Sequence, residues 1–125
     1  MTDIQIPDLP PYTFDLYQSQ SMRTAKDMGS EADLIHAALG LASEAGEFCD
    51  AIKKSFAYEK ELDIENLLEE LGDLLWFTAL ACNALGVPMQ TVAVNNVAKL
   101  LKRYPEAFTN DDALARADKV GEGVN

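Results

Sequence analysis

Apolar and polar positions alternate along most of this chain with the period of an α-helix. The clearest stripe lies between residues 31 and 57, where apolar side chains recur every three or four positions: Leu34, Ile35, Ala38, Leu39, Ala42, Ala45, Phe48 and Ile52. A period near 3.6 residues is typical of an amphipathic helix. We therefore predict a helix from Glu31 to about Ala57, preceded by Ser30-Glu-Ala-Asp33, which has the form of a capping box with Asp in place of Glu.

The most apolar segment, from Ile64 to about Leu85, has two neighbouring stripes. The first contains Leu67, Leu68, Leu71, Leu74, Leu75 and Thr78, and the second contains Phe77, Leu80, Ala81 and Ala84. Asp63 precedes the segment and can cap it. A helix that is apolar on more than one face is buried on several sides. We expect a subunit interface to cover the second stripe.

Three shorter helices are predicted around these two. The first runs from Phe14 to Met28, with Thr13 as N-cap and Gly29 as its stop. The next runs from Met89 to Tyr104, beginning near Pro88 and ending at Pro105. A short one, from Asp111 to Lys119, is capped by Asn110. The second of these has four apolar residues expected to point inward: Val92, Val97, Leu100 and Leu101.

The remaining segments contain no strand pattern, so the predicted class is all-α, a bundle of four to five helices. Residues 1–12 contain three prolines and are expected to form an extended arm, residues 13–108 to form the helical domain, and residues 109–125 to form a short helix with a loose tail. A charged connector is expected at residues 58–62. Gly40 and Gly46 each cost a helix about 1 kcal/mol relative to Ala, so we favour close approach of a neighbour or ligand over poor optimisation.

Charge and composition narrow the function. The chain has 125 residues, 48% of them hydrophobic, and a net charge of −11 from 21 acidic and 10 basic residues. This balance argues against non-specific nucleic-acid binding, which depends on Lys and Arg. The N-terminus lacks the pattern of a signal peptide, and no apolar run approaches the length needed to span a membrane. Cys49 and Cys82 fall in helical patterns and are expected to be reduced thiols of a cytoplasmic protein.

Two acidic pairs, Glu44-Ala-Gly-Glu47 and Glu70-Leu-Gly-Asp73, lie inside the two long helical patterns. Residues three apart share one helix face, with their Cβ atoms about 5–6 Å apart. If the two helices pack side by side, four carboxylates converge and require a cation. Oxygen ligands of this kind suit Mg²⁺, with Mn²⁺ as the alternative. Spacing alone leaves an ordinary amphipathic surface equally open.

Basic and aromatic residues provide candidates for substrate contact. Lys99 and Arg103 share a helix face with Asn96, and Lys53 and Lys54 follow the first acidic pair. Cations also stabilise helix C-termini, which gives Lys53, Lys54 and Arg103 a structural alternative, whereas Lys99 lies mid-helix and favours phosphate binding.

Contacts with a nucleobase have weaker candidates. Gln18 and Trp76 are the first choices, although a core or interface position is commoner for tryptophan, and Tyr12, Phe14 and Tyr17 follow. His36 is the single histidine, which is too few for a di-iron bundle. We interpret it as structural or as a residue near the substrate.

Three ordered segments resemble the MazG-like family of all-α nucleoside triphosphate pyrophosphohydrolases. They are Leu39-Gly-Leu-Ala-Ser-Glu44-Ala-Gly-Glu47, Glu69-Glu70-Leu-Gly-Asp73-Leu-Leu-Trp76 and Asn96-Val-Ala-Lys99-Leu-Leu-Lys-Arg103-Tyr-Pro105. Residues 17–25 also resemble the short, single-domain members found in bacteria and phages.

The resemblance implies Mg²⁺ bound by Glu44, Glu47, Glu70 and Asp73, phosphates bound by Asn96, Lys99 and Arg103, and a homodimer or tetramer. The expected reaction is hydrolysis of a nucleoside triphosphate to the monophosphate and pyrophosphate, with Glu47 as base and Glu44 beside it. Two alternatives stay open: a non-catalytic scaffold or regulatory nucleotide-binding module of this fold, and a metal protein without nucleotide chemistry.

Overall fold

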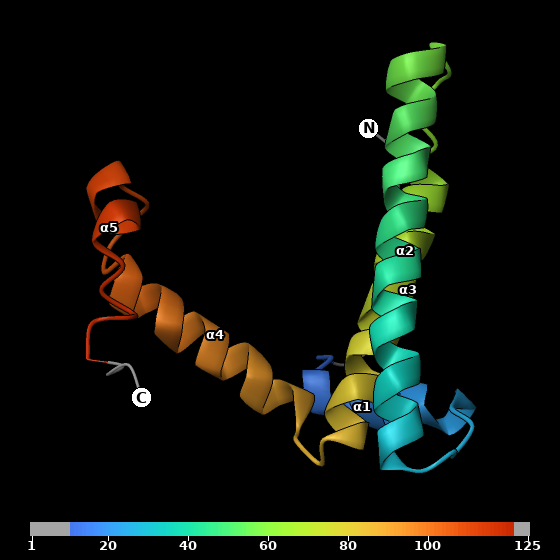
Figure 1. Cartoon of the computed structure of the whole chain (residues 1–125), viewed down its shortest axis with the longest axis horizontal. Helices are drawn as coiled ribbons and strands as arrows, with labels where there is room; N and C mark the ends of the chain where they lie inside the picture. The colour runs from blue at the N-terminus through green and yellow to red at the C-terminus, as the bar shows by residue number, and fades with distance from the viewer. Residues whose placement is uncertain (1–10, 122–125) are drawn as a thin grey trace. The chain divides into compact units, whose positions relative to one another are not determined.

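The structure is a computed structural model that describes residues 11–121 (Figure 1). Its elements are α1 (Phe14–Ser21), the 3₁₀ turn η1 (Met22–Thr24), α2 (Ser30–Tyr58), α3 (Ile64–Ala84), α4 (Met89–Arg103) and α5 (Asn110–Ala115). No strand occurs in this range, so the all-α prediction is confirmed. The chain divides into two compact units at Met89–Gln90, and each is described by itself. Most of the expected N-terminal arm, and residues 122–125 of the tail, lie outside the described residues.

The first unit is built on the long helices α2 and α3, which lie side by side (Figure 1). α1 and η1 also pack against α3. The buried apolar residues are few, and half of them are small: Ala37, Leu67, Ala79, Leu80, Cys82 and Met89. Ala79, Cys82 and Met89 form one cluster, against which Tyr17 of α1 and Met22 of η1 pack.

The prediction for α1 is wrong at its C-terminal end. Thr13 caps the helix as expected, by accepting a hydrogen bond from the Leu16 amide. The helix ends at Ser21 instead of Met28, because a tertiary contact fixes the following turn. The indole N–H of Trp76 donates to the Ser21 carbonyl at 3.3 Å and to Thr24 Oγ1 at 2.8 Å.

The start of α2 also differs from the expected capping box. Gly29, expected to end the preceding helix, is the N-cap of α2 with φ +89°, a conformation that favours glycine. Ser30 is the first helical residue and provides no cap, whereas Asp33 Oδ1 accepts the Met28 amide at 3.2 Å. The predicted box is therefore wrong, because Asp33 accepts the amide of Met28 and not that of Ser30.

The bounds of the later helices are close to the predicted ones, except at α5. Asp63 caps α3 by accepting the Asn66 amide at 3.0 Å. The N-cap of α5 is Thr109 rather than Asn110, and the helix ends before Arg116, which has a left-handed φ of +50°. The predicted extension to Lys119 is wrong because this left-handed residue terminates the helix.

The two glycines of α2 differ in their surroundings. A Cβ on Gly40 would lie less than 3.0 Å from three ring carbons of Phe77, so close approach is confirmed there. A Cβ on Gly46 would meet nothing within 4 Å. No neighbour in the described residues therefore explains Gly46, and close approach of a ligand stays a prediction there.

Much apolar surface of the long helices remains exposed. On α3 it is the first stripe that is left partly open, at Leu68, Leu71 and Leu75, whereas the second stripe packs within the unit through Leu80 and Phe77. The expectation that a partner covers the second stripe is therefore wrong. On α4, Val92, Val97, Leu100 and Leu101 are exposed within the second unit, so no core of that unit receives them.

No single helix in residues 11–121 is long and apolar enough to cross a membrane, and α3 and α4 meet that criterion only when counted together.

Candidate metal centre

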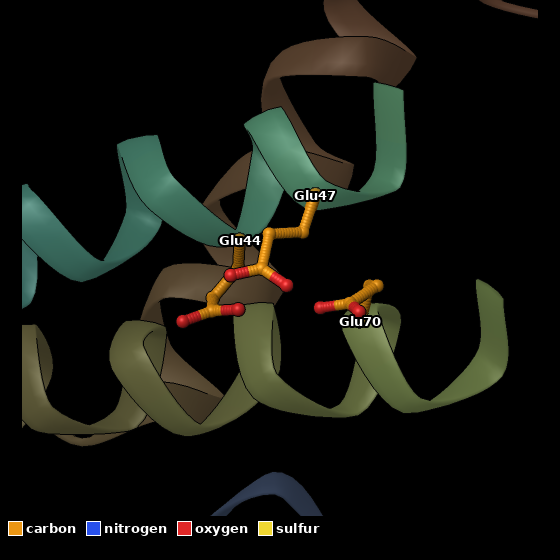
Figure 2. A group of neighbouring side chains, drawn as sticks. All are labelled: Glu44, Glu47 and Glu70. Carbon is orange, nitrogen blue, oxygen red and sulfur yellow. The ribbon is translucent and has the colours of Figure 1, made fainter. Parts of the chain in front are cut away.

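Three glutamates from the two long helices converge on one point. Glu44 and Glu47 lie on α2 and Glu70 lies on α3, and their carboxylates face one another across the helix pair (Figure 2). One oxygen from each lies within 4.8 Å of the others. Glu70 is buried, with 7% of its surface exposed, whereas Glu44 is half-buried and Glu47 is exposed. The group is therefore anchored at one side and open to solvent at the other.

The electrostatics of this cluster favour a bound cation. Burial raises the pKa of Glu70, and the neighbouring charges of Glu47, Glu44 and Asp73 raise it further. None of the ion pairs among the described residues includes Glu44, Glu47 or Glu70. The charge of Glu47 raises the pKa of Lys54, so one lysine lies near the cluster, but it pairs with Asp50. Since one shared lysine cannot balance three clustered carboxylates, a divalent cation is the natural counter-charge. The donor set, all carboxylate oxygens, fits Mg²⁺ or Mn²⁺.

The fourth predicted ligand, Asp73, lies outside this group. It is exposed and follows Glu70 by one turn of α3. Its charge raises the pKa of both Glu70 and the Tyr17 hydroxyl, which indicates that Asp73 lies near both. The structure thus brings together three of the four predicted carboxylates and leaves the fourth at the edge of the cluster.

Three of the four basic residues expected to bind substrate, Lys53, Lys54 and Arg103, have acidic partners in the chain. Lys53 and Lys54 both pair with Asp50 on the same helix, with Lys54 Nζ 2.8 Å from Asp50 Oδ2. The spacing of three and four residues is that of ordinary ion pairs on a helix surface. In the second unit, Asn96 and Lys99 are exposed, whereas Arg103 pairs with Asp118.

Gln18 and Trp76, the two residues predicted to contact a base, have structural partners. Gln18 Nε2 donates to the Val87 carbonyl at 3.2 Å, and its Oε1 accepts the Met89 amide at 2.6 Å. Trp76 holds η1 through its indole N–H and packs edge-on against His36 and Phe77. His36 accordingly lies in an aromatic group and not among the clustered carboxylates.

Comparison with known proteins assigns the family. The MazG nucleotide pyrophosphohydrolase domain matches residues 34–108, more than half of the chain. This chain belongs to the MazG family. A relative, the Gene 37 protein of Mycobacterium phage L5, is 33% identical over 98 residues, which cover 71% of this chain and 86% of the phage protein. No solved structure gives a significant match.

The match separates the residues described above into two groups. Both acidic pairs and the Asn96-x-x-Lys99-x-x-x-Arg103 segment lie inside the MazG domain match. Gln18 and Asp118 lie outside it, yet both make two hydrogen bonds into it: Gln18 bonds once each to Val87 and Met89, and Asp118 bonds twice to Arg103. Asp118 was missed by the sequence reasoning because no local pattern connects it with an arginine 15 residues earlier. The pairing of Asp50 with two lysines, by contrast, has a local signal in its spacing.

Proposed function

We propose that this MazG-family chain is a Mg²⁺-dependent nucleoside triphosphate pyrophosphohydrolase. The observation that carries the proposal is the meeting of Glu44, Glu47 and Glu70, within 4.8 Å of one another and without a basic partner among the described ion pairs. A site of this composition holds a hard divalent ion, and Mg²⁺ in proteins is commonly shared between carboxylates and substrate phosphates. Mn²⁺ is the alternative ion.

The chain's own residues divide the work of hydrolysis. Glu44, Glu47, Glu70 and, from the edge, Asp73 would hold the ion, which when bound would polarise the α-phosphate and lower the pKa of a coordinated water. Glu47, the most exposed member, accepts the proton of the attacking water. The water oxygen bonds to the α-phosphorus, and the bond from that phosphorus to the α,β-bridging oxygen breaks. The products are the nucleoside monophosphate and pyrophosphate.

The leaving pyrophosphate carries the charge that the basic residues would stabilise. We assign this role to Lys99 and Arg103, with Asn96 as a hydrogen-bond donor. Lys53 and Lys54 remain predicted phosphate contacts that would exchange Asp50 for substrate. The structural partners of Gln18 and Trp76 argue against a primary role for either in base recognition.

The decisive experiment is a panel of canonical and modified nucleoside triphosphates with Mg²⁺, scored for pyrophosphate against orthophosphate. Glu47→Gln should keep the fold and lose most turnover, because its amide cannot accept the proton. Glu69→Gln is the matched control, since Glu69 is an exposed neighbour of Glu70 outside the cluster. Wild-type turnover by Glu47→Gln, or orthophosphate as the first product, would refute the proposal.

We also propose that the chain works as a homodimer at least. The exposed apolar side chains of α2 include Ile35 at 56%, Leu39 at 67% and Phe56 at 89% exposure, and α3 adds its open first stripe. An apolar surface of this kind on a long helix pair is typical of a protein interface. Light scattering should give a mass of two or four chains, and Leu39→Glu should lower it. A monomeric wild type across the micromolar range would contradict this.

A further inference from the structure

The C-terminal segment of the second unit contains a buried acid. The Asp118 side chain is only 1% exposed, and its two oxygens accept hydrogen bonds from Arg103 Nε at 2.7 Å and Nη2 at 2.9 Å. Arg116 Nε lies 3.6 Å from the same carboxylate. The guanidinium beside it lowers the pKa of Asp118 to about 2. Asp118 is therefore ionised at neutral pH and holds Arg103 at two points.

The ion pair occupies only one edge of the guanidinium. An arginine has five N–H donors in a planar fork. The contact with Asp118 uses two of them, and the Tyr104 side chain is a further hydrogen-bond partner of the guanidinium, so the rest of the fork is left for another anion. The Arg103 side chain keeps 19% of its surface exposed. Its guanidinium carbon lies 5.8 Å from the centre of the Tyr104 ring, which itself packs against Phe108. The plane of the guanidinium is thus fixed from two directions while part of it stays accessible.

We propose that Asp118 is a positioning residue that orients Arg103 so that its outer N–H groups bind the polyphosphate of the substrate. The inference rests on the proposed function, which assigns a phosphate contact to Arg103. An unrestrained arginine loses many rotamers when it binds an anion, whereas a side chain already held by a carboxylate loses few. Second partners of this kind commonly set the orientation of a ligand-binding side chain.

The test uses inorganic tripolyphosphate with Mg²⁺ as a probe that lacks a base, measured by calorimetry on the full chain. Asp118→Asn removes the charge and the two-point acceptor and should weaken binding about tenfold, as loss of an orienting partner does at metal sites. Arg103→Ala should weaken binding at least as much, and Asp118→Asn should add nothing in that background. In turnover assays, Asp118→Asn should raise KM much more than it lowers kcat. Asp111→Asn is the matched control, an exposed acid of the same segment.

Several outcomes would overturn the proposal. One is wild-type binding of tripolyphosphate by Asp118→Asn, even if thermal unfolding shows a less stable protein, since the pair would then only support the fold. Another is an equal loss from Asp118→Asn with and without Arg103. If Asp118→Asn does not fold, Arg103→Lys provides the test, because it keeps the charge and loses the oriented fork: wild-type affinity in Arg103→Lys would refute the positioning role.

The binding assay separates this inference from the proposed function. A wild-type chain that binds tripolyphosphate through the Asp118–Arg103 pair but releases no pyrophosphate from any nucleotide would refute the function and leave the inference standing. A chain that releases pyrophosphate, with Asp118→Asn unchanged in both KM and tripolyphosphate affinity, would do the opposite. A wild type that binds no tripolyphosphate would overturn the inference, and the nucleotide panel would decide the function by itself.

Discussion

The contact between Gly40 and Phe77 predicts that the same substitution is less favourable at Gly40 than at Gly46, two positions of α2. In Gly40→Ala the new methyl group would lie less than 3.0 Å from three carbons of the Phe77 ring. The ring cannot move freely, because its centroid lies 5.0 Å from that of Trp76 and 5.4 Å from that of His36. Gly46→Ala adds the same methyl group where nothing lies within 4 Å.

The magnitude follows from two opposing effects. Replacement of a mid-helix Gly by Ala stabilises a helix by about 1 kcal/mol. Overpacking at Gly40 costs about 1–3 kcal/mol, which offsets or exceeds that gain. The helix contribution cancels between the two variants, so Gly40→Ala should be less stable than Gly46→Ala by about 1–3 kcal/mol. At about 4 °C for each kcal/mol in a domain of this size, the Tm values should differ by roughly 4–12 °C.

Thermal unfolding followed by circular dichroism, at one fixed protein concentration, measures this difference. A second substitution, Phe77→Leu, removes the ring, and in its presence Gly40→Ala should lose its penalty. Equal Tm values for Gly40→Ala and Gly46→Ala would refute the packing described here. So would a Gly40→Ala penalty that persists unchanged in the Phe77→Leu background, since the clash would then involve another group.

Three further predictions concern ionisation and hydrogen bonding. Because the pKa of Glu70 is raised above its ordinary 4.5 in the folded chain, the metal-free protein should lose stability as pH rises from about 4.5 through that raised pKa. Glu70→Gln should flatten the dependence of folding stability on pH and abolish thermal stabilisation by Mg²⁺. An unchanged rise in Tm with Mg²⁺ would contradict this prediction. The pKa of Asp118 is lowered from 3.8 to about 2. Its contribution to folding stability should therefore persist above pH 4 and disappear as pH falls through 2. The stability of Asp118→Asn, followed over the same acid titration, should lack that step. Trp76→Phe loses the indole hydrogen bonds to Ser21 and Thr24. It should lower the free energy of unfolding in urea by about 1 kcal/mol and leave KM unchanged. A large rise in KM would instead favour contact between Trp76 and the base.

The long helices were predictable because their signals are local. The 3.6-residue stripes of α2 and α3 gave bounds within one residue of the observed Ser30–Tyr58 and Ile64–Ala84. The end of α1 was not predictable in this way, because its terminator is Trp76, 52 residues beyond Thr24. A contact of that range has no expression in local periodicity.

The same distinction between local and long-range signals applies to the candidate site. Residues three apart on one helix necessarily share a face, so the pairing of Glu44 with Glu47 followed from spacing. The meeting of Glu70 with that pair depends on how α2 packs against α3, which the pattern permitted without requiring. Asp73 has the same spacing and lies outside the cluster. The partner of Arg103 had no local signal at all, and only the folded segment after α5 reveals it.

The contacts of Gln18 and Asp118 bear on where this protein could be shortened. A chain trimmed to the 75-residue region of family similarity, 34–108, would lack both side chains. Without Gln18, the Val87 carbonyl would lose its donor and the Met89 amide its acceptor. Without Asp118, Arg103 would lose its counter-ion. The limits of similarity therefore cut through contacts within each of the two compact units. Expression of that core alone would yield a destabilised fragment, whereas residues 11–121 preserve the ties at either end.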